Sequence, residues 1–444
     1  MNKEFHKKQN FFSFSDIDSE RKDRIMKFTS TEATPAPHVP PGVLRLTGAA
    51  KEDIPMYRIQ TMNKISPVGL NRFPSELYEV GDAVQDPQGI LVRSAKLLDL
   101  EFNPSLLAIA RAGVGVNNIP LDRCAAAGIP VFSTPGANAN AVKELVICAM
   151  LMGSRDIPGA IRWVREQAAS GVDVSTVVEK GKSAFIGPEL YKKTLGIIGL
   201  GAIGSIVANT AISLGMDVYG YDPFLSVDTA LRLDRHVHVV KDINDLYKRS
   251  DYITMHIHYT EKTARMIDAS AIAAMKRGVR VINLARGEIV DDEAMLTALD
   301  TGMVAAYITD FPNNRLLTAP HVIAMPHLGA STPESEQNCA AMAVDTLRDY
   351  LESGNIRSSV NLPEMTMDRS GVQRLCVLHK NVPGMLANIT SLFGRDGVNV
   401  ENLSNKSRGD YAYTMVDLGS KVGDNVIEDV RRTANVIRVR SLEW

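Results

Sequence analysis

Three glycines in the stretch Gly199-Leu-Gly201-Ala-Ile-Gly204 have the spacing of a turn that binds a dinucleotide. An apolar run precedes the turn and a helical pattern follows it, so a complete strand, turn and helix unit is present. Gly199 permits the tight turn, Gly201 lets the backbone approach a pyrophosphate, and Gly204 lets the helix pack closely on the strand. Where the helix opens, Ala202 and Ile203 offer free N–H groups and the positive end of the helix dipole to a phosphate. The spacing therefore predicts a dinucleotide site.

A carboxylate at the end of the next strand indicates which dinucleotide is bound. Asp222 stands eighteen residues after Gly204, where its oxygens can accept hydrogen bonds from ribose hydroxyls. The same carboxylate would repel the 2′-phosphate of NADP, because like charges held together cost on the order of several kcal/mol. We therefore predict NAD as the cofactor.

The glycine turn belongs to the second of two segments in which strands and helices alternate, a pattern that predicts parallel sheets with crossover helices. In the first segment we expect strands over 57–61, 89–92, 107–110 and 130–132, and a helix over 139–154 capped by Asn140. In the second we expect strands over 194–198, 217–221, 252–257, 279–284, 305–309 and 322–325. The clearest helices there cover 203–214 and 292–301, and one over 340–351 follows. The last seventy or so residues predict a small α+β domain of strand, helix, strand, strand, helix and strand.

Composition narrows the class of protein. The chain has 444 residues, which suggests about three domains. Its 49 Lys plus Arg against 51 Asp plus Glu argue against a nucleic acid or an anionic membrane as partner. The four cysteines form no CxxC pair and predict buried thiols in a reducing, cytoplasmic compartment. Two His-x-His pairs, at 236/238 and 256/258, lack a third ligand, so we predict no metal site.

Residues 1–56 differ in composition from the rest of the chain. They combine Phe11, Phe12 and Phe14 with charged and proline-rich stretches, and they lack the apolar segment of a secretory signal. We expect a poorly ordered extension. The alternative is a strap that docks on a neighbouring subunit through its phenylalanines.

Five motifs, in this order and spacing, resemble the D-isomer-specific 2-hydroxyacid dehydrogenase family. They are IARAGVGVNNIP (109–120), VFSTPGANANAV (131–142), GIIGLGAIG (196–204), NLARGEIVDDEAML (283–296) and MPHLGAST (325–332). The resemblance covers about residues 57–363. It implies an α/β fold with two doubly wound Rossmann-like domains, followed by an α+β domain of the ACT type. The implied domains are a discontinuous substrate-binding domain (57–155 and 327–363), an inserted NAD-binding domain (156–326), a linker (364–371) and the ACT domain (372–444).

Oxidation of a 2-hydroxy acid moves a hydride from C2 and a proton from the hydroxyl group. His327 suits the base because the pKa of imidazole lies near neutral pH. Arg286 follows a predicted strand, and its guanidinium can clamp the substrate carboxylate and polarise the C2 oxygen. The resemblance gives both residues these catalytic roles. It also places Thr263, Ala285 and Asp310 beside the cofactor.

Two arginines at predicted strand ends resemble the residues that contact a substrate phosphate in this family. The guanidinium groups of Arg93 and Arg111 would each bind the phosphate dianion through two N–H groups. The backbone at Gly113 and Val114 would approach the substrate carboxylate. The implied reaction is the oxidation of 3-phospho-D-glycerate to 3-phosphohydroxypyruvate, the first step of the phosphorylated serine pathway. The alternatives are another 2-hydroxy or 2-oxo acid, such as 2-oxoglutarate as substrate for reduction, and a non-catalytic NAD-sensing protein.

The sequence departs from the family at the carboxylate that holds the catalytic imidazole. No glutamate stands between Arg286 and His327 after the strand that ends near Asp310, and Asn313 or Asn314 occupies the expected place. Loss of an orienting carboxylate can cost about 10⁴ in rate. Either another carboxylate substitutes, or the enzyme is slow, or it has lost activity. The candidate substitutes are Glu144, Glu334 and Glu336.

The C-terminal domain resembles regulatory modules that bind amino acids. His379 and Asn381 flank a turn before its first helix, and Asn399 opens its second strand. In serine-regulated relatives these positions hold the effector, so L-serine is the expected ligand; the alternative is a purely structural dimerisation module. The resemblance further implies dimers through the cofactor domain and tetramers through the ACT domain.

Overall fold

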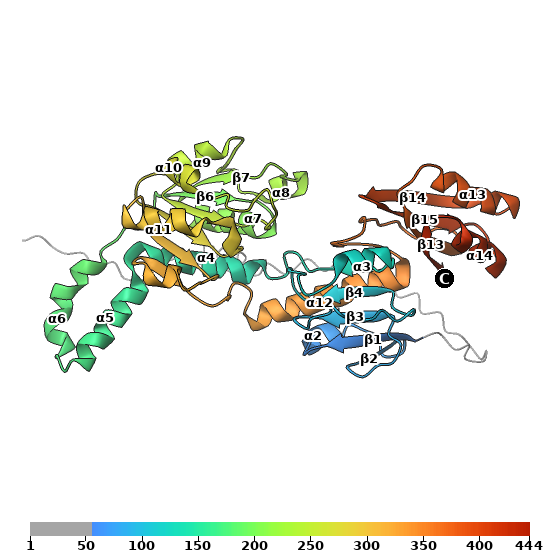
Figure 1. Cartoon of the computed structure of the whole chain (residues 1–444), viewed down its shortest axis with the longest axis horizontal. Helices are drawn as coiled ribbons and strands as arrows, with labels where there is room; N and C mark the ends of the chain where they lie inside the picture. The colour runs from blue at the N-terminus through green and yellow to red at the C-terminus, as the bar shows by residue number, and fades with distance from the viewer. Residues whose placement is uncertain (1–55) are drawn as a thin grey trace, which may run out of the picture. The chain divides into compact units, whose positions relative to one another are not determined.

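The computed structural model describes residues 56–444, which contain three β-sheets (Figure 1). The prediction of a poorly ordered extension or strap over residues 1–56 falls almost wholly outside the described residues. None of the described helices is long and apolar enough to cross a membrane.

The first sheet contains five parallel strands in the order β2-β1-β3-β4-β5. Every residue of the third strand is buried because its side chains alternate between two apolar clusters, with Leu91 in one and Ile90 and Val92 in the other. Four strands lie within one residue of their predicted bounds, whereas β2 was not predicted, being short and at the sheet edge. The elements are β1 (Tyr57–Met62), α2 (Pro67–Leu70), β2 (Tyr78–Gly81), β3 (Gly89–Val92), β4 (Ala108–Arg111), α3 (Leu121–Ala126) and β5 (Val131–Phe132).

A long helix from late in the sequence packs against the first sheet. This helix, α12 (Pro333–Ser353), supplies Val344, Leu347 and Leu351 to the same apolar cluster as Leu91. It begins seven residues earlier than predicted, because Thr332 accepts a hydrogen bond from the backbone N–H of Ser335 at its N-terminus. The first sheet is therefore completed by a discontinuous part of the chain.

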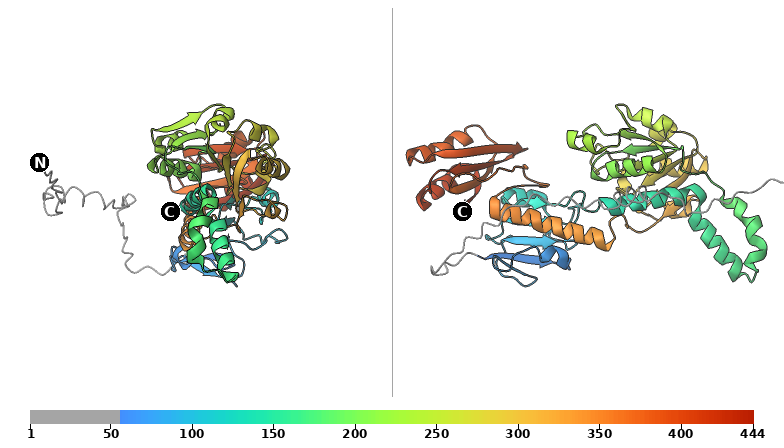
Figure 2. Two further views of the ribbon diagram at one scale, coloured as in Figure 1. Left: turned by 90° about the vertical axis from the view of Figure 1, so that its left-hand side faces the viewer. Right: turned by 180° about the vertical axis from the view of Figure 1, so that it is seen from behind.

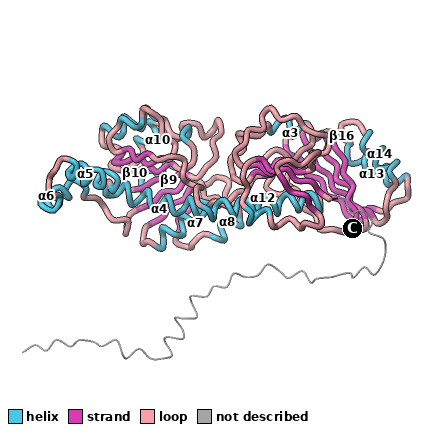
Figure 3. The backbone as a smooth tube through the Cα atoms, turned by 90° about the horizontal axis from the view of Figure 1, so that it is seen from below, coloured by secondary structure: helices cyan, strands magenta, loops and turns pink. Residues whose placement is uncertain are grey.

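The second sheet contains seven parallel strands in the order β12-β11-β10-β9-β6-β7-β8, with helices on its two sides (Figure 3). The chain runs from β6 outward to β8 and then returns to place β9 on the other side of β6. Ligands of such sheets bind at this reversal, beyond the carboxyl ends of the strands. The strands are β6 (Thr194–Ile198), β7 (Asp217–Tyr221), β8 (Val237–Val240), β9 (Tyr252–Met255), β10 (Val279–Asn283), β11 (Val304–Thr309) and β12 (Val322–Ala324). The helical elements are α7 (Ala202–Ser213), α8 (Val227–Arg232), α9 (Ile243–Arg249), α10 (Ala269–Ala273), η2 (Gly287–Ile289), α11 (Asp292–Asp300) and η3 (Leu316–Thr318).

Helix α4 (Ala139–Arg155) leads from the first sheet to the second. The predicted cap is wrong: Asn138 occupies the N-cap position, and the Asn140 amide lies within the helix, where it donates to Glu144. Cys148 on this helix is exposed, which corrects the prediction that all four cysteines are buried; all four are free thiols.

Two further helices extend away from the second sheet (Figure 1, Figure 2). They are α5 (Ile157–Ala169) and α6 (Val174–Gly181), followed by η1 (Lys182–Phe185), and none of the three contains a buried residue. These helices were not predicted, because their apolar residues belong to no core cluster of residues 56–444.

The third sheet is antiparallel, with the order β14-β15-β13-β16, and the predicted strand and helix sequence is confirmed. Along its strands the side chains alternate, so Leu375 and Val377 pack against the helices of this domain while Cys376 and Leu378 join the cluster that contains α12. The elements are β13 (Gln373–Lys380), α13 (Met385–Arg395), β14 (Val400–Arg408), β15 (Tyr411–Leu418), α14 (Asp424–Arg432) and β16 (Val436–Glu443).

Candidate active site

In the glycine turn between β6 and α7, a side chain would clash with neighbouring atoms at two of the glycines and would meet open space at the third. A Cβ at Gly199, where φ is +90°, would lie 2.6 Å from the carbonyl oxygen of His256, and one at Gly204 would lie 1.9 Å from the carbonyl oxygen of Gly199. A Cβ at Gly201 would meet nothing within 4 Å. The backbone beside Gly201 is thus accessible to a ligand such as a pyrophosphate, as are the first helical residues, Ala202 and Ile203.

Asp222 lies directly beside this turn. One of its carboxylate oxygens accepts a hydrogen bond from the N–H of Leu200 at 2.9 Å, and the other accepts one from the N–H of Phe224 at 2.9 Å. These two bonds fix the carboxylate at the end of β7. Each oxygen retains a lone pair that can accept a further hydrogen bond from a hydroxyl group.

Arg286 follows β10 and is positioned by a buried amide that the sequence analysis missed. The Asn283 side chain donates to the carbonyl oxygen of Arg286 at 2.9 Å and accepts from the N–H of Ala285 at 3.1 Å. The guanidinium donates to the carbonyl oxygen of Ala285 at 2.6 Å. Asn283 ends the apolar run VRVIN, and a buried amide needs hydrogen-bond partners. Its position could therefore have predicted that it bonds to the backbone that follows the strand.

The two residues predicted to be catalytic lie against the same aromatic ring. The guanidinium carbon of Arg286 is 5.8 Å from the ring centroid of Phe311, and the imidazole centroid of His327 is 4.7 Å from it. His327 is exposed, and its imidazole forms no hydrogen bond with any residue of the 56–444 range. A base and a cation near one ring can approach one substrate carbon.

Asp310 has a buried oxygen atom without a partner. The residue is 1% exposed, and its Oδ2 accepts from the N–H groups of Leu328 and Gly329 at 3.2 and 3.1 Å. Its Oδ1 is buried and has no hydrogen-bond partner among the described residues. Burial raises the pKa of Asp310, and the nearby His327 opposes this shift. An unpaired buried acceptor is costly and indicates a donor that residues 56–444 do not supply.

Three guanidinium groups gather around the turn that begins at Gly113. Arg111 ends β4, and its Nε donates to the carbonyl oxygen of Arg93 at 3.0 Å. A Cβ at Gly113 would lie 2.5 Å from Nη1 of Arg111, and one at Gly115 would lie 3.0 Å from Nη2 of Arg286. Burial lowers the pKa of Arg111, and the charges of Arg286 and Arg93 lower it further. Such a concentration of positive charge suits an anionic ligand.

The loop after β5 connects this turn to the cofactor helix. The N–H of Thr134 donates to the carbonyl oxygen of Gly113 at 3.2 Å, and a Cβ at Gly136 would lie 3.2 Å from the Cβ of Ala202. Thr134 Oγ1 and Asn138 Oδ1 are buried without a partner in the described part of the chain. Both residues lie in the motif VFSTPGANANAV (131–142), but neither was predicted to belong to the site.

The side chains proposed to replace the missing glutamate have other partners. The Asn313 amide donates to Asp292 at 2.6 Å and accepts from the N–H groups at the start of η3. Glu144 accepts from Asn140 at 2.9 Å, and Glu336 pairs with Arg93. None of the bonds that Asn313, Glu144 and Glu336 form involves the imidazole of His327.

Thr263 serves a turn within its own segment. Its hydroxyl donates to the carbonyl oxygen of His258 at 2.8 Å and lies 2.7 Å from the N–H of Thr260, from which it accepts. It therefore shapes the segment after β9, at the same edge of the sheet as Gly199.

The first histidine pair contacts neighbouring side chains. His236 bonds to Asp234, and His238 stacks on Tyr219 at 4.9 Å between ring centroids. Within residues 56–444 no three potential ligands cluster.

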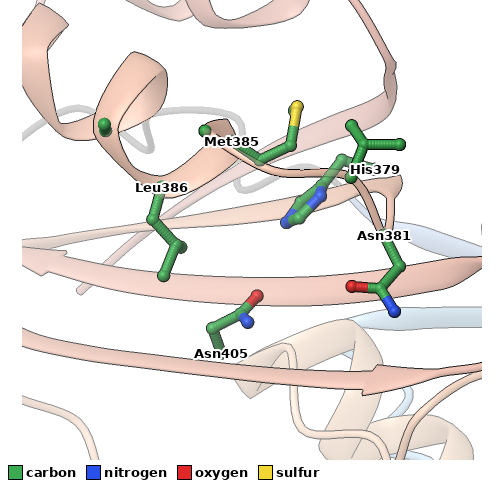
Figure 4. Close-up of a pocket in the computed structure, with 8 residues that line it drawn as sticks. His379, Asn381, Met385, Leu386 and Asn405 are labelled. Carbon is green, nitrogen blue, oxygen red and sulfur yellow. The ribbon is translucent and has the colours of Figure 1, made fainter.

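Two of the three predicted effector residues line one pocket in the C-terminal domain (Figure 4). His379 and Asn381 lie beside the start of α13, and Asn405 on β14 completes the polar part of the pocket. The hydroxyl of Thr414 links His379 and Asn405 through contacts of 2.8 Å each. Asn399 does not line this pocket; its amide donates to Glu401. Asn405 was missed because a polar residue within an exposed strand carries no distinct signal.

Comparisons with known proteins identify the family. The NAD-binding domain of the D-isomer specific 2-hydroxyacid dehydrogenases matches residues 147–329. A D-3-phosphoglycerate dehydrogenase from Escherichia coli (strain K12) is 31% identical over 380 residues, which cover 82% of this chain and 89% of that protein. The chain belongs to the D-isomer-specific 2-hydroxyacid dehydrogenase family. This confirms the predicted resemblance, the α/β fold and the NAD-binding domain.

Other members of the family differ in length or in sequence. A D-3-phosphoglycerate dehydrogenase from Synechocystis is 36% identical over 326 residues, but this chain spans only 56% of its length. The solved structure of an NAD⁺-bound 3-phosphoglycerate dehydrogenase from Entamoeba histolytica matches with a TM-score of 0.54 and 26% identity, over 69% of this chain and 99% of that one. A D-mandelate dehydrogenase from Rhodotorula graminis, at 21% identity and a TM-score of 0.60, shares the fold.

Proposed function

We propose that this protein oxidises 3-phospho-D-glycerate to 3-phosphohydroxypyruvate with NAD. The observation that carries the proposal is the gathering of Arg93, Arg111 and Arg286 around the turn at Gly113. A substrate with a carboxylate at one end and a phosphate at the other matches three guanidinium groups. The relatives named D-3-phosphoglycerate dehydrogenase support the same substrate.

The residues of the glycine turn fit NAD. The open space at Gly201 and the N–H groups that begin α7 would hold the pyrophosphate, and Asp222 would bind the adenosine ribose. The unpaired Oδ1 of Asp310 would accept a hydrogen bond from the nicotinamide carboxamide. When bound, NAD supplies the acceptor for the hydride.

In the proposed reaction Arg286 binds the substrate carboxylate and polarises the C2 oxygen. His327 removes the proton of the C2 hydroxyl while the C2–H bond breaks. Arg93 and Arg111 hold the phosphate, and the backbone at Gly113 and Val114 borders the carboxylate. The imidazole has Phe311 beside it and forms no hydrogen bond with a carboxylate of residues 56–444, so the orienting carboxylate of a triad is missing from this part of the chain.

We also propose the domain roles that the resemblance implies. The first sheet with α12 binds substrate over 57–155 and 327–363, residues 156–326 bind NAD, and residues 372–444 regulate. The four free thiols support a reducing, cytoplasmic location.

A steady-state assay with 3-phospho-D-glycerate and NAD tests the proposed function. We expect NADH formation that His327→Asn abolishes while NAD affinity is unchanged. Turnover of D-2-hydroxyglutarate in preference to the phosphorylated acid would instead assign a different substrate. NAD binding without turnover of either acid would favour the NAD-sensing alternative.

We propose L-serine as the effector of the pocket formed by His379, Asn381 and Asn405. Short polar side chains of this kind can bind the ammonium, carboxylate and hydroxyl groups of serine, and Val382 and Met385 border its small apolar part. A titration of L-serine against initial rate tests this. Inhibition that Asn381→Ala weakens supports the site, and no inhibition at millimolar serine leaves a dimerisation role.

We propose that the protein forms a homodimer through α5 and α6, with a homotetramer as the larger form expected from relatives. These helices expose Ile161, Val164 and Val178 at 51%, 39% and 38%, and none of their residues is buried within the described part of the chain. Apolar side chains arranged along such helices favour a partner surface. Sedimentation analysis of the Ile161→Glu, Val164→Glu variant should show a smaller species than the wild type.

A further inference from the structure

The loop that follows β3 and begins with Arg93 is held by side chains from other segments. The carbonyl oxygen of Arg93 accepts a hydrogen bond from Nε of Arg111 at 3.0 Å. Further along the loop, the carbonyl oxygen of Ala95 accepts from Nδ2 of Asn118 at 2.7 Å. Backbone groups of a loop need partners, and here side chains from the end of β4 and from the loop after it provide them.

Asn63 supplies two more of these bonds. Its Oδ1 accepts from the N–H groups of Ser94 and Ala95, at 3.1 and 2.6 Å. Asn63 follows β1 as Arg93 follows β3, and these two strands are neighbours in the first sheet, so the asparagine lies beside the loop. One amide oxygen thus fixes two successive residues directly after Arg93.

The backbone of Asn63 is in the left-handed region. Its φ is +79°, a conformation that glycine adopts freely and that asparagine tolerates better than most other residues. Glycine would therefore fit this backbone position, but it could not supply an oxygen to the two N–H groups. The amide of Asn63 serves the neighbouring loop and is not needed for the turn itself.

The side chain of Arg93 is not held in place by burial. It is 45% exposed, and its pair with Glu336 is also exposed and weak enough to open for a ligand. A flexible side chain loses less freedom on binding a ligand when the backbone that carries it is already fixed. The position of the loop therefore determines how well the guanidinium can meet a phosphate.

We propose that Asn63 is a positioning residue that holds the loop of Arg93 for the substrate phosphate. The inference rests on the proposed function, since it assumes that Arg93 binds this phosphate. Asn63 needs no contact with the substrate, because its effect on affinity passes through Arg93. Loss of the amide oxygen releases two N–H groups of the loop and lets the guanidinium move away from the phosphate.

A double-mutant cycle of Asn63 with Arg93 tests the inference. Asn63→Gly removes the amide oxygen and adds no backbone strain, because glycine suits a φ of +79°. Dissociation constants for 3-phospho-D-glycerate are measured by calorimetry on the full chain with NADH, which cannot accept a hydride. We expect Asn63→Gly to weaken binding roughly tenfold, about 1.4 kcal/mol, and Arg93→Ala to weaken it more. The double variant should bind as Arg93→Ala does, because no guanidinium remains to be positioned.

Asn103→Gly is the matched control. Asn103 also holds a turn through its Oδ1, which accepts from the N–H of Ser105 at 3.1 Å. It precedes β4, whereas Arg93 follows the parallel strand β3, so the two residues lie at opposite edges of the sheet. The control should bind 3-phospho-D-glycerate as the wild type does. Thermal unfolding of every variant shows whether it is folded.

Two results would overturn the inference while the proposed function stands. The first is unchanged affinity in folded Asn63→Gly. The second is a further loss of affinity in the double variant relative to Arg93→Ala, which would show that Asn63 acts on another group.

Other results bear on the proposed function. Equal affinity of the wild type and Arg93→Ala would remove Arg93 from the phosphate site, and no binding of the acid by the wild type would contradict the proposed substrate; either result would also end the inference. Because the cycle measures binding, it is independent of turnover. A protein that binds the acid without oxidising it contradicts the proposed reaction alone, and the cycle still decides the role of Asn63.

Discussion

The glycine turn and the arginine cluster are built in different ways. At the turn, backbone atoms define the shape: the space that a side chain at Gly204 would need is already filled by the Gly199 carbonyl group, and that beside Gly201 is open. At the cluster, flexible charged side chains define the site, and one of them, Arg93, has a carboxylate partner that a ligand can replace. A site shaped by backbone atoms tolerates almost no substitution. In a site formed by charged side chains, single substitutions can change ligand affinity without changing the fold. The predictions below test this contrast in order of decreasing effect.

The largest effect is expected from alanine substitutions within the turn. Gly204→Ala places a Cβ 1.9 Å from a carbonyl oxygen, so we expect the domain to be destabilised by several kcal/mol, on the order of the largest single-residue effects. Gly201→Ala meets no atom within 4 Å. It should leave the unfolding temperature unchanged while NAD affinity falls roughly a hundredfold, about 3 kcal/mol. Thermal unfolding and NAD titration measure both. Equal NAD affinity in Gly201→Ala would show that the open space is not the cofactor site.

Loss of the proposed base comes next. We expect His327→Asn to lower kcat roughly 10²–10⁴-fold, as removal of a general base does, with little change in NAD affinity. Phe311→Leu serves as a comparison, because it removes the ring beside the imidazole and keeps the base. We expect kcat to fall less in Phe311→Leu than in His327→Asn. If kcat of Phe311→Leu falls by a larger factor than its KM rises, the ring positions His327. Equal activity of wild type and His327→Asn would contradict the mechanism.

The third prediction concerns the pH dependence of stability that arises from His256, a residue packed against the glycine turn. Burial lowers the pKa of His256, whose carbonyl group faces Gly199, from 6.5 to about 4. The unfolded chain therefore binds a proton below pH 6.5 that the folded chain does not bind until about pH 4. Stability from this group is complete above pH 6.5 and decreases as the pH falls to 4, by up to about 3 kcal/mol. Denaturant unfolding at pH 7 and pH 4.5 should show a smaller difference in His256→Asn than in the wild type. An equal difference would mean that His256 contributes nothing to the pH dependence.

The smallest effect is expected at the ribose. Asp222→Asn retains the size of the side chain and an acceptor for the N–H of Leu200 but removes the charge. We expect the preference for NAD over NADP to fall roughly tenfold, about 1.4 kcal/mol. The ratio of kcat/KM for the two cofactors measures it. A wild type that prefers NADP would refute the role of Asp222.

Patterns in the sequence predicted the α/β class, the strands of both parallel sheets except β2 and β8, the glycine turn with Asp222, and the family. Local patterns suffice for these features because the spacing of apolar residues and glycines within one strand and helix unit reports the backbone directly. Three predictions were wrong: Asn140 does not cap α4, α12 begins before residue 340, and Cys148 is exposed.

Which side chains from distant segments meet became clear from the fold. Phe311 lies beside both Arg286 and His327, and Glu336 reaches Arg93 across 243 residues of sequence. Each of these contacts forms because several strands end at the same edge of a sheet or because α12 returns to the first sheet. The physical reason is that a side chain's partner is set by the packing of whole elements, and no spacing within one segment encodes the distance between two of them.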